Sequence, residues 1–458
     1  MMIRQKQFYR TFFALTLSLA LQNLLTYSVN LMDTLMLARY SQDAMSGVSL
    51  CNQIQFLLQM IAEGGGEGVV ILGSQYWGKN RLAPIPHIIG AALRVTLSLA
   101  AVLFVLISFA PVPTLSLLSN DAAVIAQGAA YFRVIRFSYL IFTATRVLVA
   151  SLRSIGIVKL GQIISFSTLC INITLNYLLI YGHGGFPELG VRGAAIATLV
   201  SRCVELLIVV CYLKFRERQL NLTAKKLLLI DGSYISDFLR VAFPGMLNQA
   251  LWGVAQMAQT GILGHLGGDV TAANAITVQV YQVLSVIAYG SASASGITVG
   301  KTIGEGGGME ALRPLVRTLE TLFIVIGICS GLLIFLLRTP ILSLFGRSLT
   351  DAARALSYQF MAVIALTTVG TSYQMACDVG IIRGGGDTAF SAKMNLISMW
   401  LIVIPFSALA AFRWDAPPVV AFFLLKWDQL YKIIPVSVRL HSWKWPRKVT
   451  RESADSPL

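Results

Sequence analysis

Residues 34–78 read TLMLARYSQDAMSGVSLCNQIQFLLQMIAEGGGEGVVILGSQYWG, and they align without a gap with residues 260–304, which read TGILGHLGGDVTAANAITVQVYQVLSVIAYGSASASGITVGKTIG. The shared register matches polar residues and glycines as well as apolar ones: Asp43 with Asp269, Gln53 with Gln279, Gly64 with Gly290, and Gly78 with Gly304. Chance matches in an apolar sequence fall mainly on apolar residues. The register therefore indicates that the chain contains two homologous halves.

The composition of the chain is that of a membrane protein. Of its 458 residues, 56% are hydrophobic and 12% are charged, which excludes an ordinary soluble domain of this length. The formal net charge of +15 is also found in nucleic-acid-binding proteins, but here Lys and Arg concentrate in the loops between apolar segments. We therefore expect the lipid bilayer, and no nucleic acid, as a partner.

The cysteines and histidines form no pattern that is typical of a metal or cofactor site. Six cysteines lie inside or at the edges of apolar runs without a CxxC pair, and four histidines are scattered through loops and the tail. We interpret the cysteines as small core residues. We expect no metal, no cofactor and no catalytic residues, and hence a protein that is not an enzyme.

Twelve apolar segments are long enough to cross a bilayer, which takes about 20 residues per helix. They lie near 12–38, 47–72, 88–110, 126–151, 160–181, 191–213, 236–262, 271–300, 316–337, 355–382, 388–411 and 418–438. Lys and Arg are several times more frequent in the loops on the side of the N-terminus, which places both termini in the cytoplasm. Six helices per half give both halves the same orientation. We therefore predict an all-α polytopic membrane protein with two parallel-repeat, six-helix lobes, as in secondary transporters.

These segments also define the expected domains. Residues 1–213 form an N-terminal lobe, residues 214–234 a basic cytoplasmic linker, residues 235–440 a C-terminal lobe and residues 441–458 a cytoplasmic tail. Five basic residues lie in the linker: Lys214, Arg216, Arg218, Lys225 and Lys226. We interpret them as a solvated loop rather than as a lipid-binding patch.

Several strings along the chain resemble members of the multidrug and toxic compound extrusion (MATE) family of transporters. They are NLMDTLMLAR at 30–39, GSQYWGKN at 73–80, LRSIG at 152–156, NITLNYLLIYG at 172–182, GVRGAAIAT at 190–198, IRGGGDT at 382–388 and WKW at 443–445. Together, their order and spacing cover nearly the whole chain.

The resemblance implies a secondary active antiporter. Family members have two six-helix lobes around a central cavity, and they export amphipathic, often cationic organic compounds by alternating access in exchange for protons or sodium ions. On this basis we expect a multi-pass protein of the cell (inner) membrane that acts as a monomer on small organic substrates, with H⁺ or Na⁺ as its coupling ion.

The resemblance also implies a cation- or proton-coupling site in the first half of the chain. Four residues match the family's positions: Asp33, Asn172, Asn176 and Thr198. A carboxylate with amide and hydroxyl oxygens suits a hard monovalent cation, and the carboxylate can instead take up a proton. Some family members have Asp where Asn176 stands, so only one formal charge remains here. Ordinary hydrogen bonding between helices is an alternative role for the Asn and Thr residues.

A second candidate site lies in the string AEGGGEG at 62–68, where Glu63 and Glu67 share one helical face among glycines. We leave two interpretations open. The carboxylates form a second proton-handling or cationic-substrate site, or the glycines form a hinge or tight packing surface beside which the acids meet a wet cavity.

Seven further residues are candidates for lining a substrate cavity: Gln53, Gln279, Asn248, Trp252, Tyr289, Lys426 and Asp428. Lys426 and Asp428 can alternatively neutralise each other.

The second half lacks two acids that some family members carry. No acid follows Pro244 in the seventh predicted helix, and Thr371 and Ser372 stand near the other position. These departures argue against a cation site in the C-terminal lobe. Two charged pairs are interpreted as local ion pairs: Asp378 with Arg383, and Glu205 with Arg202.

Other functions are less compatible with the sequence. A lipid-linked saccharide flippase of the same superfamily, the main alternative, needs a cavity rich in Arg or Lys, whereas the intramembrane ionisable residues here are mostly acidic. A lipid-modifying enzyme would show paired Asp motifs or a membrane-facing His. The string GSQYWGKN replaces the acidic and basic signature of major-facilitator carriers. The absence of GxxxxGK[ST] argues against an ATP-driven pump.

Overall fold

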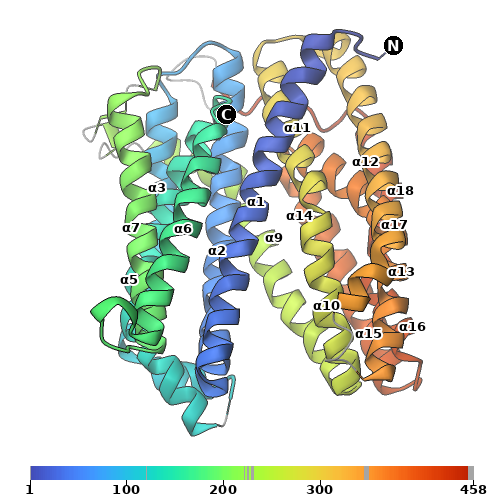
Figure 1. Cartoon of the computed structure of the whole chain (residues 1–458). Helices are drawn as coiled ribbons and strands as arrows, with labels where there is room; N and C mark the ends of the chain where they lie inside the picture. Colours follow the sequence, from blue (N-terminus) through green and yellow to red (C-terminus); the bar gives the residue numbers. More distant parts are fainter. Residues whose placement is uncertain are drawn as a thin grey trace. The chain divides into compact units, whose positions relative to one another are not determined.

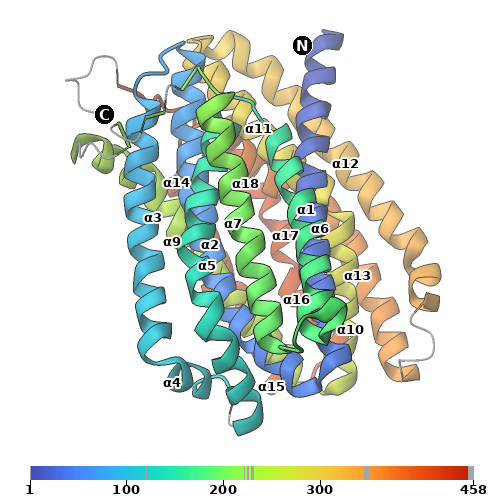
Figure 2. The same ribbon diagram turned by 60° about the vertical axis from the view of Figure 1, so that its left-hand side comes forward.

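The computed structural model describes residues 2–119, 121–220, 222–223, 226–227, 232–344 and 350–451, and within them it contains helices and no strand (Figures 1 and 2). Lys225 of the basic linker and residues 452–458 of the tail lie outside the described residues.

The described residues of the first half form six long α-helices and one short one. They are α1 (Lys6–Tyr40), α2 (Gln42–Gly78), α3 (Ile85–Phe109), α4 (Pro111–Ser116), α5 (Ala122–Ser154), α6 (Lys159–Tyr181) and α7 (Val191–Phe215). Local signals set several of the boundaries. The carboxylate of Asp121 caps α5 by accepting from the backbone N–H groups of Ala123 and Val124. Gly182 ends α6 in the left-handed conformation with φ 70°.

The helices of the second half are more often interrupted. It contains α9 (Gly232–His265), α10 (Gly268–Leu284), α11 (Val286–Gly304), α12 (Gly308–Leu344), α13 (Asp351–Met375), α14 (Thr388–Leu396), α15 (Ile404–Phe412), α16 (Pro418–Lys426), α17 (Asp428–Tyr431) and α18 (Ile433–His441). Two π-helical segments interrupt it, η2 (Ala376–Arg383) after α13 and η3 (Ile397–Val403) between α14 and α15. In such segments each backbone hydrogen bond spans one residue more than in an α-helix, and they often accompany functional sites.

Each of the twelve predicted apolar segments coincides with a helix or with a run of consecutive helices. Among the described residues, nine helices are long and apolar enough to cross a membrane, and α10 with α11 would make a tenth crossing that bends by 46°. The two other segments are α9, which contains Pro244, and the run from α16 to α18, which is divided into short pieces. The run from α16 to α18 consists of pieces that are each shorter than a membrane span, whereas α9 is long but carries Asn248, Gln249, Gln256 and Gln259 among its apolar residues.

The chain divides into two compact units. Unit 2 contains residues 21–73 and 81–246, and unit 1 contains residues 1–20, 74–80 and 247–458. In unit 2 the core includes Leu37, Leu58, Phe132, Tyr139 and Ile180. In unit 1 the core includes Phe360 and Phe422, whose rings stack 4.0 Å apart. The lobe boundaries expected from the sequence remain a prediction.

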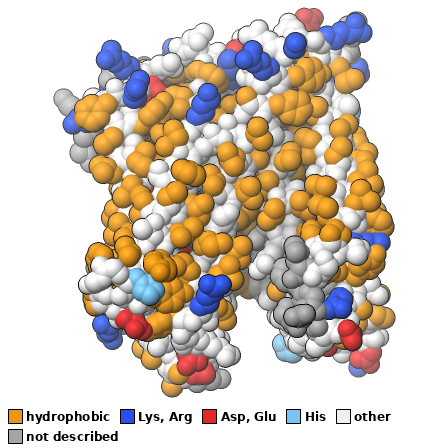
Figure 3. All heavy atoms as spheres, in the orientation of Figure 1, with side chains coloured by type: hydrophobic (Ala, Val, Ile, Leu, Met, Phe, Trp, Pro, Cys, Tyr) orange, Lys and Arg blue, Asp and Glu red, His pale blue; other side chains and the backbone are white. Residues whose placement is uncertain are grey.

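The outer surface carries large apolar side chains where they would meet lipid. Exposed examples are Leu17, Val102, Leu207, Leu336 and Leu401. Figure 3 shows hydrophobic side chains over the middle of the helices and most of the visible Lys and Arg near helix ends. An apolar belt next to basic helix ends is the pattern expected of a membrane-spanning protein.

Within unit 1, the ends of α2 and α11 cross at two glycines that the repeat aligns. A Cβ atom added at Gly78 would lie 2.1 Å from the carbonyl oxygen of Lys301, and one added at Gly304 would lie 2.1 Å from that of Gln75. The absence of side chains therefore allows the two backbones to touch.

The segment after α18 also packs on this end of α2. Trp445 is fully buried, and Gln75 donates from Nε2 to the carbonyl oxygen of Arg447 (3.0 Å). The same side chain accepts from the backbone N–H of Val449 (3.0 Å), and the hydroxyl of Tyr76 accepts from that of Arg451 (3.1 Å). Residues near the C-terminus thus complete the surroundings of the end of α2.

Candidate functional site

The four residues of the expected coupling site lie together in unit 2. Asp33 lies near the end of α1, and Thr198 lies in the second turn of α7. Asn172 and Asn176, on α6, are one turn apart and therefore share a face of that helix. Both asparagines and Thr198 are buried, whereas Asp33 is partly accessible.

A chain of hydrogen bonds connects these residues. Asn176 donates from Nδ2 to the carboxylate of Asp33 and to Oδ1 of Asn172, the second bond being 3.1 Å long. Asn172 in turn donates to the hydroxyl of Thr198 (3.4 Å). Within the described part of the chain, the buried Oδ1 of Asn176 has no hydrogen-bond partner. An unsatisfied buried acceptor is costly, so this oxygen is suited to a bound cation or water.

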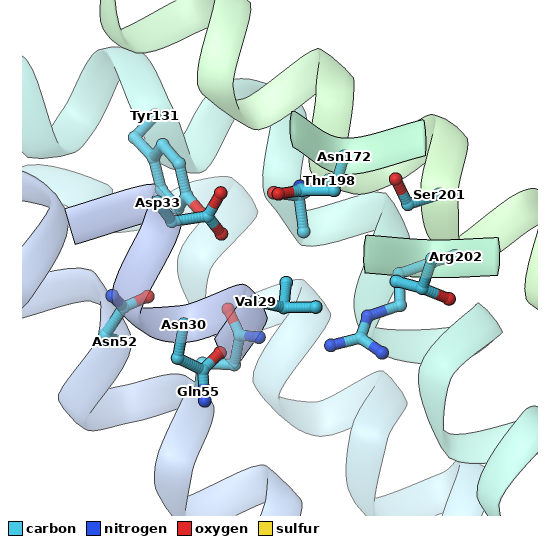
Figure 4. A pocket seen from close by; sticks show the side chains of 11 residues that line it. Val29, Asn30, Asp33, Asn52, Gln55, Tyr131, Asn172, Thr198, Ser201 and Arg202 are labelled. Carbon is cyan, nitrogen blue, oxygen red and sulfur yellow. The ribbon is translucent and has the colours of Figure 1, made fainter. Parts of the chain in front are cut away.

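A small polar pocket opens beside this chain of hydrogen bonds (Figure 4). Besides Asp33, Asn172 and Thr198, it is lined by Val29, Asn30, Asn52, Gln55, Tyr131, Thr168, Ser201 and Arg202. The sequence-based prediction missed these eight residues. Helical periodicity could have identified some of them, because Thr168 lies four residues before Asn172, and Arg202 lies four residues after Thr198.

The cationic side chain of the pocket is neutralised by a neighbour. Arg202 forms an ion pair with Glu205 at 2.9 Å, which confirms the interpretation of these two residues as a local pair. Glu205 also accepts from the hydroxyl of Thr168 (2.7 Å), and the guanidinium lies 4.7 Å from the ring centroid of Phe142. With Asp33 included, the pocket therefore has one more carboxylate than guanidinium group.

The second candidate pair, Glu63 and Glu67, lies on α2 opposite two arginines of α5. Glu63 forms an ion pair with Arg146 at 3.2 Å, and Arg153 interacts electrostatically with both carboxylates. The sequence did not reveal these partners, because more than 80 residues separate the two helix faces along the chain.

The glycines around this pair form a packing surface. A Cβ atom added at Gly64 would lie 2.6 Å from Cα of Met246, one at Gly66 would lie 3.3 Å from Cβ of Ala150, and one at Gly73 would lie 2.4 Å from the hydroxyl of Ser154. Close helix contact and charge compensation together favour the packing interpretation of the AEGGGEG string.

The candidate cavity residues do not all come together. Asn248 and Trp252 line a second pocket, in unit 1, with Leu251, Asn395, Leu396, Met399, Trp400 and Lys432. Gln53 on α2, Gln279 on α10 and Tyr289 on α11 are not among the residues that line either pocket.

Four of the charged residues singled out in the C-terminal half, Asp378, Arg383, Lys426 and Asp428, have defined partners. Asp428 forms an ion pair with Lys432 at 2.8 Å, and Lys426 donates to Oε1 of Gln259 (3.1 Å). Nε of Arg383 lies 3.8 Å from Oδ2 of Asp378, which confirms the local ion pair expected from the sequence.

Comparisons with known proteins give a consistent result. A family model described as MatE matches residues 18–178 and 244–409. The uncharacterized transporter YisQ of Bacillus subtilis is 27% identical over 391 residues, which cover 82% of each chain. The probable multidrug resistance protein NorM of Thermotoga maritima is 26% identical over 412 residues, which cover 89% of this chain and 84% of the relative.

Solved structures show the same fold at lower sequence identity. A mutant of the MATE transporter VcmN from Vibrio cholerae superposes with a TM-score of 0.85 at 16% identity, covering 96% of this chain and 98% of that chain. A transporter of the MOP superfamily from Pyrococcus furiosus, described as having a binding pocket of reverse polarity, gives a TM-score of 0.83 at 18% identity, covering 94% and 96%. The predicted all-α fold with twelve membrane segments in two lobes is thereby confirmed.

Proposed function

The chain belongs to the MatE family of membrane transporters, and from this premise we propose that it is a secondary active antiporter that exports amphipathic, cationic organic compounds in exchange for protons or sodium ions. It is a multi-pass membrane protein. We further propose that it lies in the cell (inner) membrane with both termini in the cytoplasm, which the basic residues at one end of the helices support.

Asp33 is the residue that couples ion entry to export. It is the carboxylate in excess at the polar pocket, because Arg202 is paired with Glu205. A carboxylate within a membrane span is costly and is retained where it has a role in transport. Its hydrogen bond from Asn176 fixes its orientation toward the other polar side chains.

The oxygen atoms of this site are suited to either coupling ion. A proton needs only the carboxylate of Asp33. A sodium ion could be held by that carboxylate together with Oδ1 of Asn176, which has no partner among the described residues, and the hydroxyl of Thr198. Hard cations prefer oxygen ligands of this kind. Neutralisation of the single excess charge by the ion would remove the attraction for a cationic substrate and favour its release.

The relatives support the type of cargo. NorM of Thermotoga maritima carries the description of a probable multidrug resistance protein. The excess negative charge at the pocket of unit 2 favours substrates that carry a positive charge.

Ethidium efflux from cells under an imposed proton or sodium gradient tests the proposal. We expect wild type to export the dye under one of the two gradients, and Asp33→Asn to abolish that export. Asp43→Asn is the matched control, because Asp43 is exposed at the start of α2 and the substitution removes the same charge. Export by Asp33→Asn at the wild-type rate would refute the assigned role. Absence of export by correctly inserted wild type would favour the flippase alternative.

A further inference from the structure

Two arginines of α5 face away from the pocket around Asp33. Arg133 and Arg136 come two and five positions after Tyr131, which lines that pocket. A helix turns by about 100° per residue, so the two arginines point about 200° and 140° away from Tyr131 around the helix axis. Tyr131 is buried, whereas Arg133 is exposed and Arg136 is partly exposed. Both side chains therefore belong to the outer surface of unit 2.

The surface around these arginines is apolar. Phe137 of α5 is 46% exposed, and α5 packs beside α3 (Figure 2). Four large apolar residues of α3 are exposed on one face of that helix, at the spacing i, i+3, i+4 and i+7: Val102, Val105, Leu106 and Phe109. Contiguous exposed apolar side chains in a membrane protein are covered by lipid chains.

The two arginines carry charges that the protein does not neutralise. Among the described residues, neither guanidinium group has an ion-pair or hydrogen-bond partner, and Nε of Arg136 is buried. The nearest acid along α5 is Asp121, twelve positions before Arg133 and thus about 18 Å away along the axis. Its carboxylate caps the helix instead. Arginine within a membrane span is costly and normally has a partner.

Arg136 is held in place by two aromatic rings. Its guanidinium carbon lies 6.0 Å from the ring centroid of Phe104 on α3 and 5.0 Å from that of Phe137, and these centroids are 5.6 Å apart. Such contacts occupy the face of a guanidinium group and orient its plane. The planar fork of N–H donors matches two oxygens of a phosphate group.

The arginines lie at the depth of lipid headgroups. Phe104, which contacts Arg136, comes five positions before the end of α3, about 7.5 Å along its axis. The polar zone on each side of the hydrocarbon core of a bilayer is about 5 to 7 Å thick, and an arginine side chain can extend toward it. In the proposed topology this end of α3 is on the outer side, where the positive-inside rule does not favour arginine.

We propose that Arg133 and Arg136 bind the phosphate of an anionic phospholipid in the outer leaflet, whose acyl chains cover the exposed apolar face of α3. The two unpaired cations complement a headgroup that carries a net negative charge, whereas a zwitterionic lipid brings its own cation to the site. The proposal does not depend on the coupling ion or on the transported compound. Because Tyr131 on the same helix lines the pocket around Asp33, the lipid would stabilise the helix that forms one wall of that pocket.

Native mass spectrometry of the purified full-length protein tests this site by counting bound phospholipids. We expect wild type to bind phosphatidylglycerol more tightly than phosphatidylcholine. In Arg133→Met/Arg136→Met we expect the affinity of the tightest phosphatidylglycerol to fall about tenfold or more, because two charge-assisted contacts are lost. Arg133→Met alone changes an exposed position, should lose part of the affinity, and provides the test if the double variant does not fold.

A matched pair of arginines controls for general attraction to anionic lipid. Arg39→Met/Arg192→Met removes two exposed arginines, from the end of α1 and the start of α7, and should retain wild-type affinity. Inorganic phosphate should not displace the lipid, since it has no chains to cover α3. Equal phosphatidylglycerol affinity in wild type and the α5 variants, an equal loss in the control pair, or displacement by inorganic phosphate would overturn the proposal.

Discussion

Substitution of Gly304 by alanine should separate the ends of α2 and α11. The added Cβ would lie 2.1 Å from the carbonyl oxygen of Gln75, whereas ordinary contacts of this kind are 3.4–4 Å long, so the two backbones must move apart by more than 1 Å. Overpacking of a buried contact typically costs about 1 to 3 kcal/mol. We expect the upper part of that range, because a backbone carbonyl cannot rotate away as a flexible side chain can.

Thermal unfolding of the purified protein in detergent, followed by intrinsic fluorescence, measures the effect. Gly264→Ala is the matched control, because no atom of the described residues beyond the adjoining part of its own helix lies within 4 Å of the added Cβ. An alanine in this helix should be neutral or stabilise by up to about 1 kcal/mol. Gly78→Ala, on the other side of the contact, should resemble Gly304→Ala. The double variant should cost less than the two single changes combined, because one separation relieves both clashes. An unfolding midpoint for Gly304→Ala equal to that of Gly264→Ala would refute the reasoning.

Three further outcomes follow from the polar contacts of unit 2. Asn176→Ala removes the donor to the coupling carboxylate and the amide oxygen proposed as a sodium ligand, so it should weaken a sodium site by about 1 to 3 kcal/mol and raise the sodium concentration that half-saturates efflux, whereas proton uptake by Asp33, which this donor opposes, should not be weakened. Arg202→Met leaves the buried Glu205 without its cationic partner and should destabilise the protein by about 3 to 5 kcal/mol. Arg202→Met/Glu205→Met should recover much of that loss in a thermal unfolding assay. Glu63→Gln/Glu67→Gln removes charges that face two arginines, so it should lower thermal stability. The ion that drives efflux should stay the same, when efflux is measured per folded molecule. A change of driving ion would instead favour a coupling role.

The sequence alone predicted those features that depend on local patterns. Runs of about 20 apolar residues located the helices, because a bilayer requires that length. The spacing of Asn172 and Asn176 placed both on one face of α6, as the structure has them. That Asp33 lies close to Asn172 and Asn176 was expected only from the family resemblance, because Asp33 is 139 positions before Asn172 in the sequence.

The remaining features depend on contacts between distant segments. Nothing near Glu63 in the sequence indicates that Arg146 lies opposite it. Lys432 was not identified as a candidate at all, because its pocket forms only where η3 and the broken helices α16 to α18 meet α9. Local propensity does not reveal such interruptions, since the apolar pattern continues through them. Tertiary packing decides both cases.

Unit 1 contains residues from both ends of the sequence, which affects the order in which its contacts can form during synthesis. Residues 1–20 belong to it, but most of their unit consists of residues 247–458, and Gln75 is bonded to Arg447 and Val449. During translation residues 1–20 are made long before the other residues of their unit. Folding of this unit is therefore governed by late, long-range contacts, which are slow to form. The end of α2 that belongs to this unit, residues 74–80, therefore cannot complete its contacts until residues 447–449 have been synthesised.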